Sequence, residues 1–72
     1  MKGADFIRRI RKVGRERGVP VQFVSHGKGS HGRLYYADRF TTVKDRKKEL
    51  SKGLVHAMLR QLGLDERDLE GK

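Results

Sequence analysis

The sequence predicts one α+β domain in which a helix, three antiparallel strands and a second helix follow one another (α-β-β-β-α). Three observations carry this prediction. Apolar residues recur at helical spacing near both ends of the chain, the middle is rich in β-branched and aromatic residues, and 72 residues leave room for a single core. Two helices on one face of the three-stranded sheet would bury both apolar stripes.

The first helix is predicted over residues 4–17. Its apolar side chains are spaced by one, three and four positions and therefore share one face: Phe6, Ile7, Ile10 and Val13. Gly18 suits the left-handed residue that ends a helix, and Pro20 prevents its continuation. Gly14 is an earlier possible end.

The middle of the chain has the composition of strands. They are predicted over residues 21–24, 34–36 and 40–43. Residues 37–39 are short enough for a tight hairpin, and residues 26–32 form a loop whose three glycines let the backbone approach a ligand closely. One face of the sheet is expected to meet solvent. By alternation Tyr36 shares the inward face with Leu34, which leaves Tyr35 on the exposed face.

A second helix is predicted to start near Ser51. Its apolar residues repeat at helical spacing: Leu50, Leu54, Val55, Met58, Leu59 and Leu62. Gly63 followed by Leu64 is typical of a Schellman ending, in which the leucine folds back onto the last turn. The tail after it is expected either to form one more turn capped by Asp65 or to stay loose.

The charge of the chain favours a polyanionic partner. Lysine and arginine number 18 against 9 aspartates and glutamates, a formal net charge of +9. Four acids fall in the tail, residues 65–72, so the single domain 1–72 divides into a basic core of about residues 3–64 and an acidic end. Nucleic acid is the expected partner. A membrane surface is not, because no helix combines a basic face with a broad apolar one. A domain that is basic without such a partner is the alternative.

Composition also excludes several kinds of chemistry. Cysteine is absent, which rules out disulfides, cysteine zinc sites and cysteine nucleophiles. No apolar run approaches the ~18 residues of a membrane span and no signal-peptide pattern opens the chain, so we expect a soluble, cytoplasmic protein. Residues 27–30 (Gly-Lys-Gly-Ser) lack the spacing of a Walker loop, and a strand follows them instead of a helix.

The three histidines differ in position. His56 lies beside the apolar stripe of the second helix and is expected at the surface. His26 and His31 flank the glycine loop, where a two-histidine metal site is conceivable but lacks cysteine and a third ligand. His31 has Lys28 and Arg33 nearby, so it can exchange protons near neutral pH while these cations hold a phosphate. A turn histidine without a functional role is the alternative.

Several segments together resemble one known family. The loop Gly27-Lys28-Gly29-Ser30-His31 is followed, after a strand hairpin, by Lys-Glu-Leu-Ser-Lys-Gly-Leu over residues 48–54. Residues 58–64 then end in Gly-Leu. In these pieces and in their order, residues 3–64 resemble the HicA family of toxins.

This resemblance implies a fold like the double-stranded RNA-binding domain and a ribonuclease of a toxin–antitoxin module that cleaves messenger and related RNAs. A HicB-type antitoxin would bind the protein and mask its active site, the free toxin would be monomeric, and no cofactor is implied. The family's functional histidine corresponds to His31, and the family has no histidine at the position of His26. Two features depart from the family: the loop follows the first helix at a longer distance, and Ser51 stands where proline is common.

We therefore expect His31 to act as a general acid or base, with Lys28 and the backbone amides of Gly29 and Ser30 facing the phosphate. RNA carries its own nucleophile, the 2′-hydroxyl, so no metal is required. The products would be a 2′,3′-cyclic phosphate and a 5′-hydroxyl. The second acid or base stays open, with His26 or a lysine as candidates.

A basic cluster at the start of the second helix is expected to dock the RNA backbone: Lys47, Lys48 and Lys52. Arg33 is predicted to join in holding phosphate, and solubility is the alternative role of the lysines. Two rival functions predict binding without cleavage. One is a non-catalytic module for double-stranded RNA, and the other is a basic nucleoid-type DNA binder.

Overall fold

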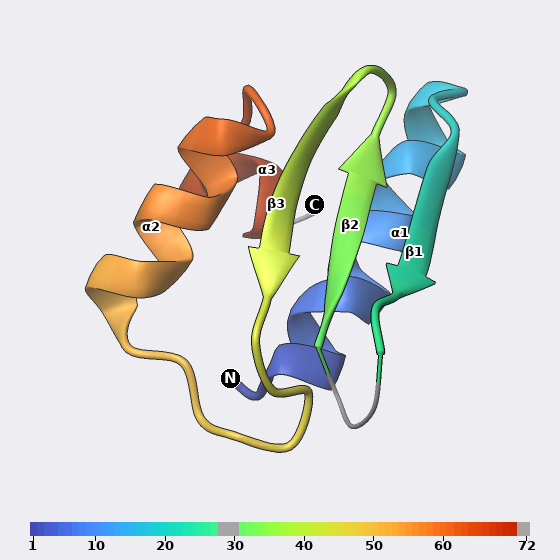
Figure 1. Cartoon of the computed structure of the whole chain (residues 1–72). Coiled ribbons are helices and arrows are strands. Elements are labelled where there is room, and N and C mark those ends of the chain that lie inside the picture. Colours follow the sequence, from blue (N-terminus) through green and yellow to red (C-terminus); the bar gives the residue numbers. More distant parts are fainter. Residues whose placement is uncertain (28–30, 71–72) are drawn as a thin grey trace.

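The computed structural model describes residues 1–27 and 31–70 and has the predicted order of elements (Figure 1). Its helices and strands are α1 (Gly3–Arg17), β1 (Val21–Ser25), β2 (Gly32–Tyr36), β3 (Arg39–Val43), α2 (Lys52–Gln61) and α3 (Glu66–Glu70). The predicted α+β layout is confirmed, with α3 as a short addition at the C-terminal end. Among the described residues, no helix is both long and apolar enough to cross a membrane.

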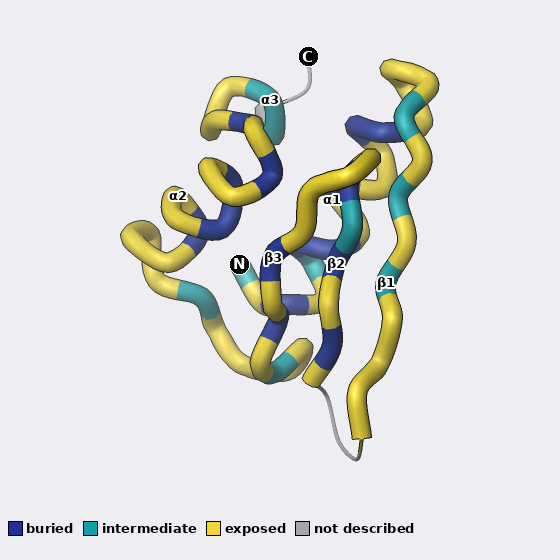
Figure 2. The backbone as a smooth tube through the Cα atoms, turned by 45° about the horizontal axis from the view of Figure 1, so that its top comes forward, coloured by how far each residue is buried: buried dark blue, intermediate teal, exposed yellow. Residues whose placement is uncertain are grey.

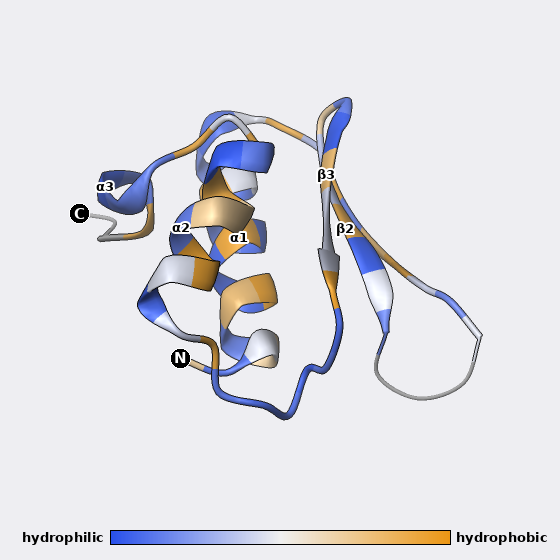
Figure 3. Ribbon diagram, turned by 60° about the vertical axis from the view of Figure 1, so that its left-hand side comes forward, coloured by the Kyte–Doolittle hydropathy of each residue, from blue (hydrophilic) through white to orange (hydrophobic). Residues whose placement is uncertain are grey.

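The three strands form one antiparallel sheet in the order β1-β2-β3, so β2 is central. Leu34 on β2 lies opposite Phe23 on β1 and Thr41 on β3, which fixes the register of both pairs. The helices α1 and α2 lie on the same side of the sheet, and no helix covers its other face within the described chain (Figure 3). The expectation of one open face is therefore confirmed.

The core lies between this sheet and the helices, where buried residues from both layers face each other (Figure 2). Its fully buried members are large and mostly apolar: Phe6, Ile10, Leu34, Val43, Leu59 and Leu62, together with Thr41. Burying each such apolar side chain contributes about 1.5–3 kcal/mol. Thr41 is tolerated there because its hydroxyl donates a hydrogen bond of 2.5 Å to Oε1 of Gln61.

Glycine decides both the length and the packing of α1. Gly18 ends the helix in the left-handed conformation, with φ of 68°, as predicted. The helix runs on through Gly14, so the earlier end is wrong. Glycine at position 14 instead allows α1 to pack closely against the start of β1. A Cβ there would lie 2.3 Å from Cγ2 of Val21 and 2.7 Å from the carbonyl oxygen of Val19.

The ends of α2 and α3 are capped as the sequence predicts. The Leu54 amide donates 3.2 Å to the Ser51 hydroxyl oxygen at the start of α2. At its end the amide of Gly63 donates to the carbonyl of Arg60 and that of Leu64 to the carbonyl of Leu59, the Schellman pattern. The next turn does form, and the Asp65 carboxylate accepts a hydrogen bond of 2.9 Å from the amide of Arg67.

Candidate functional site

His31 opens onto a cavity of ≈ 450 Å³ at one end of the β2–β3 hairpin. The wall opposite the sheet comes from α2, through Leu54 and Met58. Leu50 adds a third apolar side chain, and the other lining residues are polar or charged: Thr42, Lys44, Asp45, Lys48 and Glu49. The cavity thus joins an exposed imidazole to two ammonium groups and two carboxylates.

The position of His31 follows from the pairing of β1 with β2. Ser25 lies opposite Gly32 in the register, and one step further the His26 amide donates 3.0 Å to the carbonyl oxygen of His31. Gly32 beside it is buried under the ring of Phe23, and a Cβ there would lie 2.3 Å from Cζ of that ring. The tight packing of Gly32 therefore holds the backbone of His31 at the mouth of the cavity.

The connection from β3 to α2, residues 44–51, is held against the first turn of α1. The first amides of a helix have no partner within it. Here the Gly3 amide donates 3.1 Å to the carbonyl of Lys48, and the Ala4 amide donates 2.8 Å to the carbonyl of Arg46. A Cβ on Gly3 would lie 2.7 Å from the carbonyl oxygen of Asp45, so glycine permits this approach.

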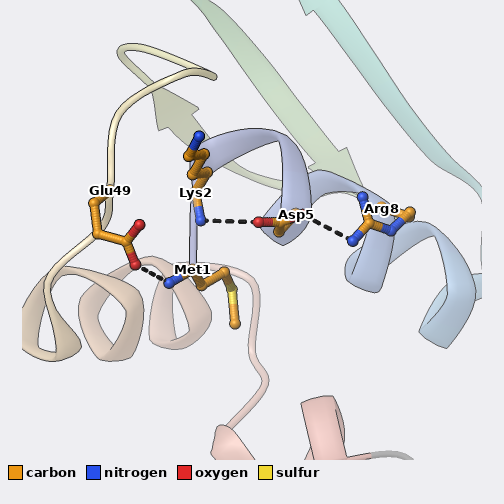
Figure 4. Close-up of polar contacts among 5 residues, drawn as sticks. All are labelled: Met1, Lys2, Asp5, Arg8 and Glu49. Carbon is orange, nitrogen blue, oxygen red and sulfur yellow. Dashed lines mark hydrogen bonds and ion pairs between the residues drawn. The ribbon is translucent and has the colours of Figure 1, made fainter.

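Side chains reinforce the same junction (Figure 4). Glu49 forms an ion pair with the N-terminal ammonium of Met1. The Asp5 carboxylate accepts a hydrogen bond of 3.1 Å from the backbone amide of Lys2 and one of 2.8 Å from the guanidinium of Arg8. These two donors, the amide of Lys2 first, lower the pKa of Asp5 from its ordinary value. The Glu49 ion pair and the two backbone hydrogen bonds hold the loop that carries the cavity lysines against the start of α1, whereas the Asp5 contacts lie within that first turn.

The predicted site residues separate into groups. Lys48 lines the cavity with His31, whereas Lys52 lines a different hollow near α3, and exposed Lys47 is not part of the cavity wall. Arg33 lies on the open face of the sheet, with its guanidinium carbon 4.7 Å from the centre of the Phe40 ring. Three further predicted residues lie outside the described ranges: Lys28, Gly29 and Ser30.

Sequence reasoning missed Lys44. Gly32 lies opposite Val43, so the next pair along the hairpin brings His31 and Lys44 together, and both line the cavity. The signal was the alternation of β3, in which Thr42 and Lys44 follow Phe40 on one face. It becomes informative only when the pairing with β2 is known.

The cavity also holds carboxylates that the sequence analysis did not assign to it. Asp45 accepts a hydrogen bond of 2.9 Å from the amide of Lys47, and Glu49 is paired with the chain terminus, so both already have partners. Within residues 1–27 and 31–70, no group of three or more histidine, cysteine, aspartate or glutamate side chains is arranged to hold a metal ion. The two-histidine metal site conceived from the sequence gains no third ligand there.

Comparison with known proteins adds one positive finding. Neither the curated proteins nor the solved structures yielded a match. Residues 3–64 match the family model described as HicA toxin of bacterial toxin–antitoxin. The matched residues include all of α1, the sheet and α2, and they end with the Gly-Leu turn that closes α2. This chain belongs to the HicA family and is a toxin of the toxin–antitoxin type.

Proposed function

We propose that this toxin is an endoribonuclease that cleaves messenger and related RNAs in the cytoplasm, with His31 as a general acid or base. The observation that carries the proposal is the cavity shared by His31, Lys44 and Lys48. An exposed imidazole can exchange protons near neutral pH. Ammonium groups beside it stabilise the negative charge that develops on a phosphate during the reaction.

The proposed reaction uses the nucleophile within RNA. The 2′-oxygen loses its proton to a base and attacks the adjacent phosphorus, and the bond from phosphorus to the 5′-oxygen breaks. An acid then protonates that leaving oxygen. The products are a 2′,3′-cyclic phosphate and a 5′-hydroxyl, and DNA is inert because it lacks the 2′-hydroxyl. No step of this reaction calls for a metal ion.

We assign the second proton transfer to His26. Its backbone amide contacts the carbonyl of His31 across the end of the β1–β2 pair, so the two residues occupy opposite positions. Opposite residues of an antiparallel pair point to the same face, with Cβ atoms about 4.5–5.5 Å apart. Two imidazoles at that separation can serve a single scissile phosphate, one as base and the other as acid.

The test is cleavage of labelled single-stranded RNA and matched DNA in EDTA by the wild type and by histidine variants. His31→Ala and His26→Ala should each slow RNA cleavage by about 10²–10⁴-fold. His56→Ala is the matched control, because His56 is exposed on α2, does not line the cavity and has no place opposite His31 in the strand pairing. Circular dichroism checks that every variant is folded.

The products and the pH profile sharpen this test. The wild-type rate should follow a bell-shaped pH dependence, and each histidine variant should lose one limb of it. A 3′-hydroxyl with a 5′-phosphate on the fragments would contradict the proposed reaction. Binding of RNA duplexes without cleavage would instead support the non-catalytic RNA-binding module.

We further propose that the antitoxin is a HicB-type protein that covers the His31 cavity of the monomeric toxin. The physical reason is the net charge of +9, which attracts an acidic partner and speeds the encounter. Adding the antitoxin should stop cleavage, and its association rate should fall as salt is raised. An inhibited complex in which His31 is still readily modified by diethylpyrocarbonate would exclude masking of the cavity.

A further inference from the structure

The open face of the sheet carries an unusual set of side chains for a solvated surface. The register of the three strands places six residues on it: Gln22, Val24, Arg33, Tyr35, Phe40 and Thr42. Phe40 is 43 % exposed and Val24 37 % exposed. None of these six described residues is acidic. The face therefore offers aromatic surface and positive charge together.

Phe40 is in contact with both Tyr35 and Arg33. The rings of Tyr35 and Phe40 lie opposite each other on β2 and β3, with centroids 5.6 Å apart and planes inclined at 47°. The guanidinium of Arg33 lies 4.7 Å from the centre of the Phe40 ring. Phe40 thus restricts both of these neighbours, so a ligand meets an already ordered surface and less conformational entropy is lost on binding.

A shallow hollow of ≈ 340 Å³ lies beside this aromatic pair. Tyr35 forms part of its wall, and Pro20, Val24 and Ala37 supply apolar surroundings. Gln22 adds an amide that can both donate and accept hydrogen bonds. A flat ring with polar edges fits such a hollow, since its face meets Tyr35 and its edge meets the amide.

The same face runs into the His31 cavity without interruption. Arg33 pairs with Thr42, and the next outward positions along the two strands are His31 and Lys44. Alternate residues of a strand are about 7 Å apart. A chain of phosphates bound at His31 and Lys44 would therefore pass over Arg33 before its bases reach Tyr35 and Phe40.

We propose that this face, defined by Gln22, Arg33, Tyr35 and Phe40, is a stacking platform for unpaired bases of single-stranded RNA. Aromatic side chains on an exposed sheet are a recurrent means of binding unstacked bases, and arginine adds contacts to the phosphates. The proposal rests on the proposed ribonuclease function and specifies its substrate, because bases within a duplex cannot reach the rings. Charge favours RNA over an apolar protein partner on this surface.

The test measures affinity for fluorescein-labelled oligouridine and for the oligouridine–oligoadenylate duplex, with His31→Ala present throughout to keep the probe intact. Phe40→Leu retains apolar bulk but removes the ring, and should weaken single-strand binding roughly 5- to 150-fold. Phe40→Trp restores a ring and should keep the affinity. Duplex binding should change little in both variants.

A second readout reports stacking directly. The chain has no tryptophan, so Phe40→Trp places a single tryptophan on the platform, whose emission can be excited apart from that of the tyrosines. Oligouridine should quench its emission, while the duplex should leave the emission unchanged. This signal does not depend on cleavage, and circular dichroism of each variant confirms the fold.

The outcomes separate this proposal from the ribonuclease proposal. Equal oligouridine affinity for Phe40→Leu and the parent would overturn the platform while leaving the cleavage result for His31 intact. If Phe40→Leu weakened binding of the duplex as much as binding of oligouridine, the platform would also be overturned. Loss of antitoxin binding alone would assign the face to a protein partner. Ring-dependent oligouridine binding by a wild-type protein that cleaves no RNA would support the platform and refute the ribonuclease.

Discussion

Lys48 and Lys52 are four residues apart in the chain, yet they serve different surfaces. Lys48 faces the cavity with His31, and Lys52 lies just inside α2 and lines a hollow with Glu66 and Leu69. The reason is geometric, because residues 44–51 form a loop with a turn that is hydrogen-bonded to the first turn of α1, whereas Lys52 already belongs to a helix. The sequence indicates a single lysine cluster, but the structure divides it between two separate surfaces.

This separation predicts an asymmetric salt dependence of RNA binding. The double substitution Lys44→Ala and Lys48→Ala should weaken binding of single-stranded RNA and reduce the slope of log K against log [salt] by about 0.7 per lysine. The pair Lys47→Ala and Lys52→Ala removes the same charge away from the cavity wall and should change the slope less. Titrations of RNA at several salt concentrations measure the slope for each double variant. Equal slopes for the two double variants would contradict a docking role for the cavity lysines.

At the scale of elements, glycines control how closely the helices approach their neighbours. Gly14 of α1 lies against Val21 of β1, where an added Cβ has no space. Gly53 of α2 is in a different situation, because nothing lies within 4 Å of the Cβ it would carry. Replacing glycine by alanine is therefore expected to change the stability in opposite directions in the two helices.

Gly14→Ala should destabilise the protein by about 1–3 kcal/mol, since Val21 and the carbonyl of Val19 must shift. Gly53→Ala should stabilise it by about 0.4–1 kcal/mol, because alanine loses less backbone entropy in a helix. Urea denaturation of both variants and the wild type measures these differences. A destabilised Gly53→Ala would show that the start of α2 needs glycine for a reason other than space.

At the scale of the whole molecule, the acidic tail is folded onto the basic helix. Asp68 of α3 forms an ion pair with Arg17 at the end of α1, and its side chain is 21 % exposed. Four cations line a hollow between these two helices: Arg8, Arg9, Lys12 and Arg15. The tail therefore places negative charge beside the densest positive charge on α1.

This contact predicts how stability depends on pH. The Asp65 amide and the Arg17 guanidinium lower the pKa of Asp68 below its ordinary value of 3.8. The stability it contributes is therefore fully present above that value and is lost as the pH falls through the lower folded-state pKa. Asp68→Asn should reduce the free energy of unfolding at neutral pH and lessen its fall in acid.

Urea denaturation between pH 7 and pH 2 tests this expectation, with the two stability curves converging at the acid end. Asp38→Asn is the matched control, because Asp38 is an exposed carboxylate in the β2–β3 turn. A constant gap between wild type and Asp68→Asn over the whole range would show that Asp68 acts through something other than its charge.

The elements of this fold were predictable because their signals are local. The spacing of Phe6, Ile10 and Val13 determines α1, and Gly18 and Ser51 mark helix ends through their own backbone or side-chain chemistry. The helix end suggested at Gly14 was wrong because this glycine is needed for close packing against Val21, a tertiary contact that no local pattern shows. His31 was identified as a candidate from its loop and from the family resemblance.

The fold class, the charge and the family of this toxin can be read from the amino-acid sequence, since periodicity, composition and motifs need no knowledge of tertiary contacts. The cations that accompany His31 depend on those contacts. Lys44 joins it through the register of β2 and β3, and Lys48 through the amides of α1 that hold its loop. The open aromatic face arises in the same way, because Tyr35 and Phe40 meet only when their strands pair.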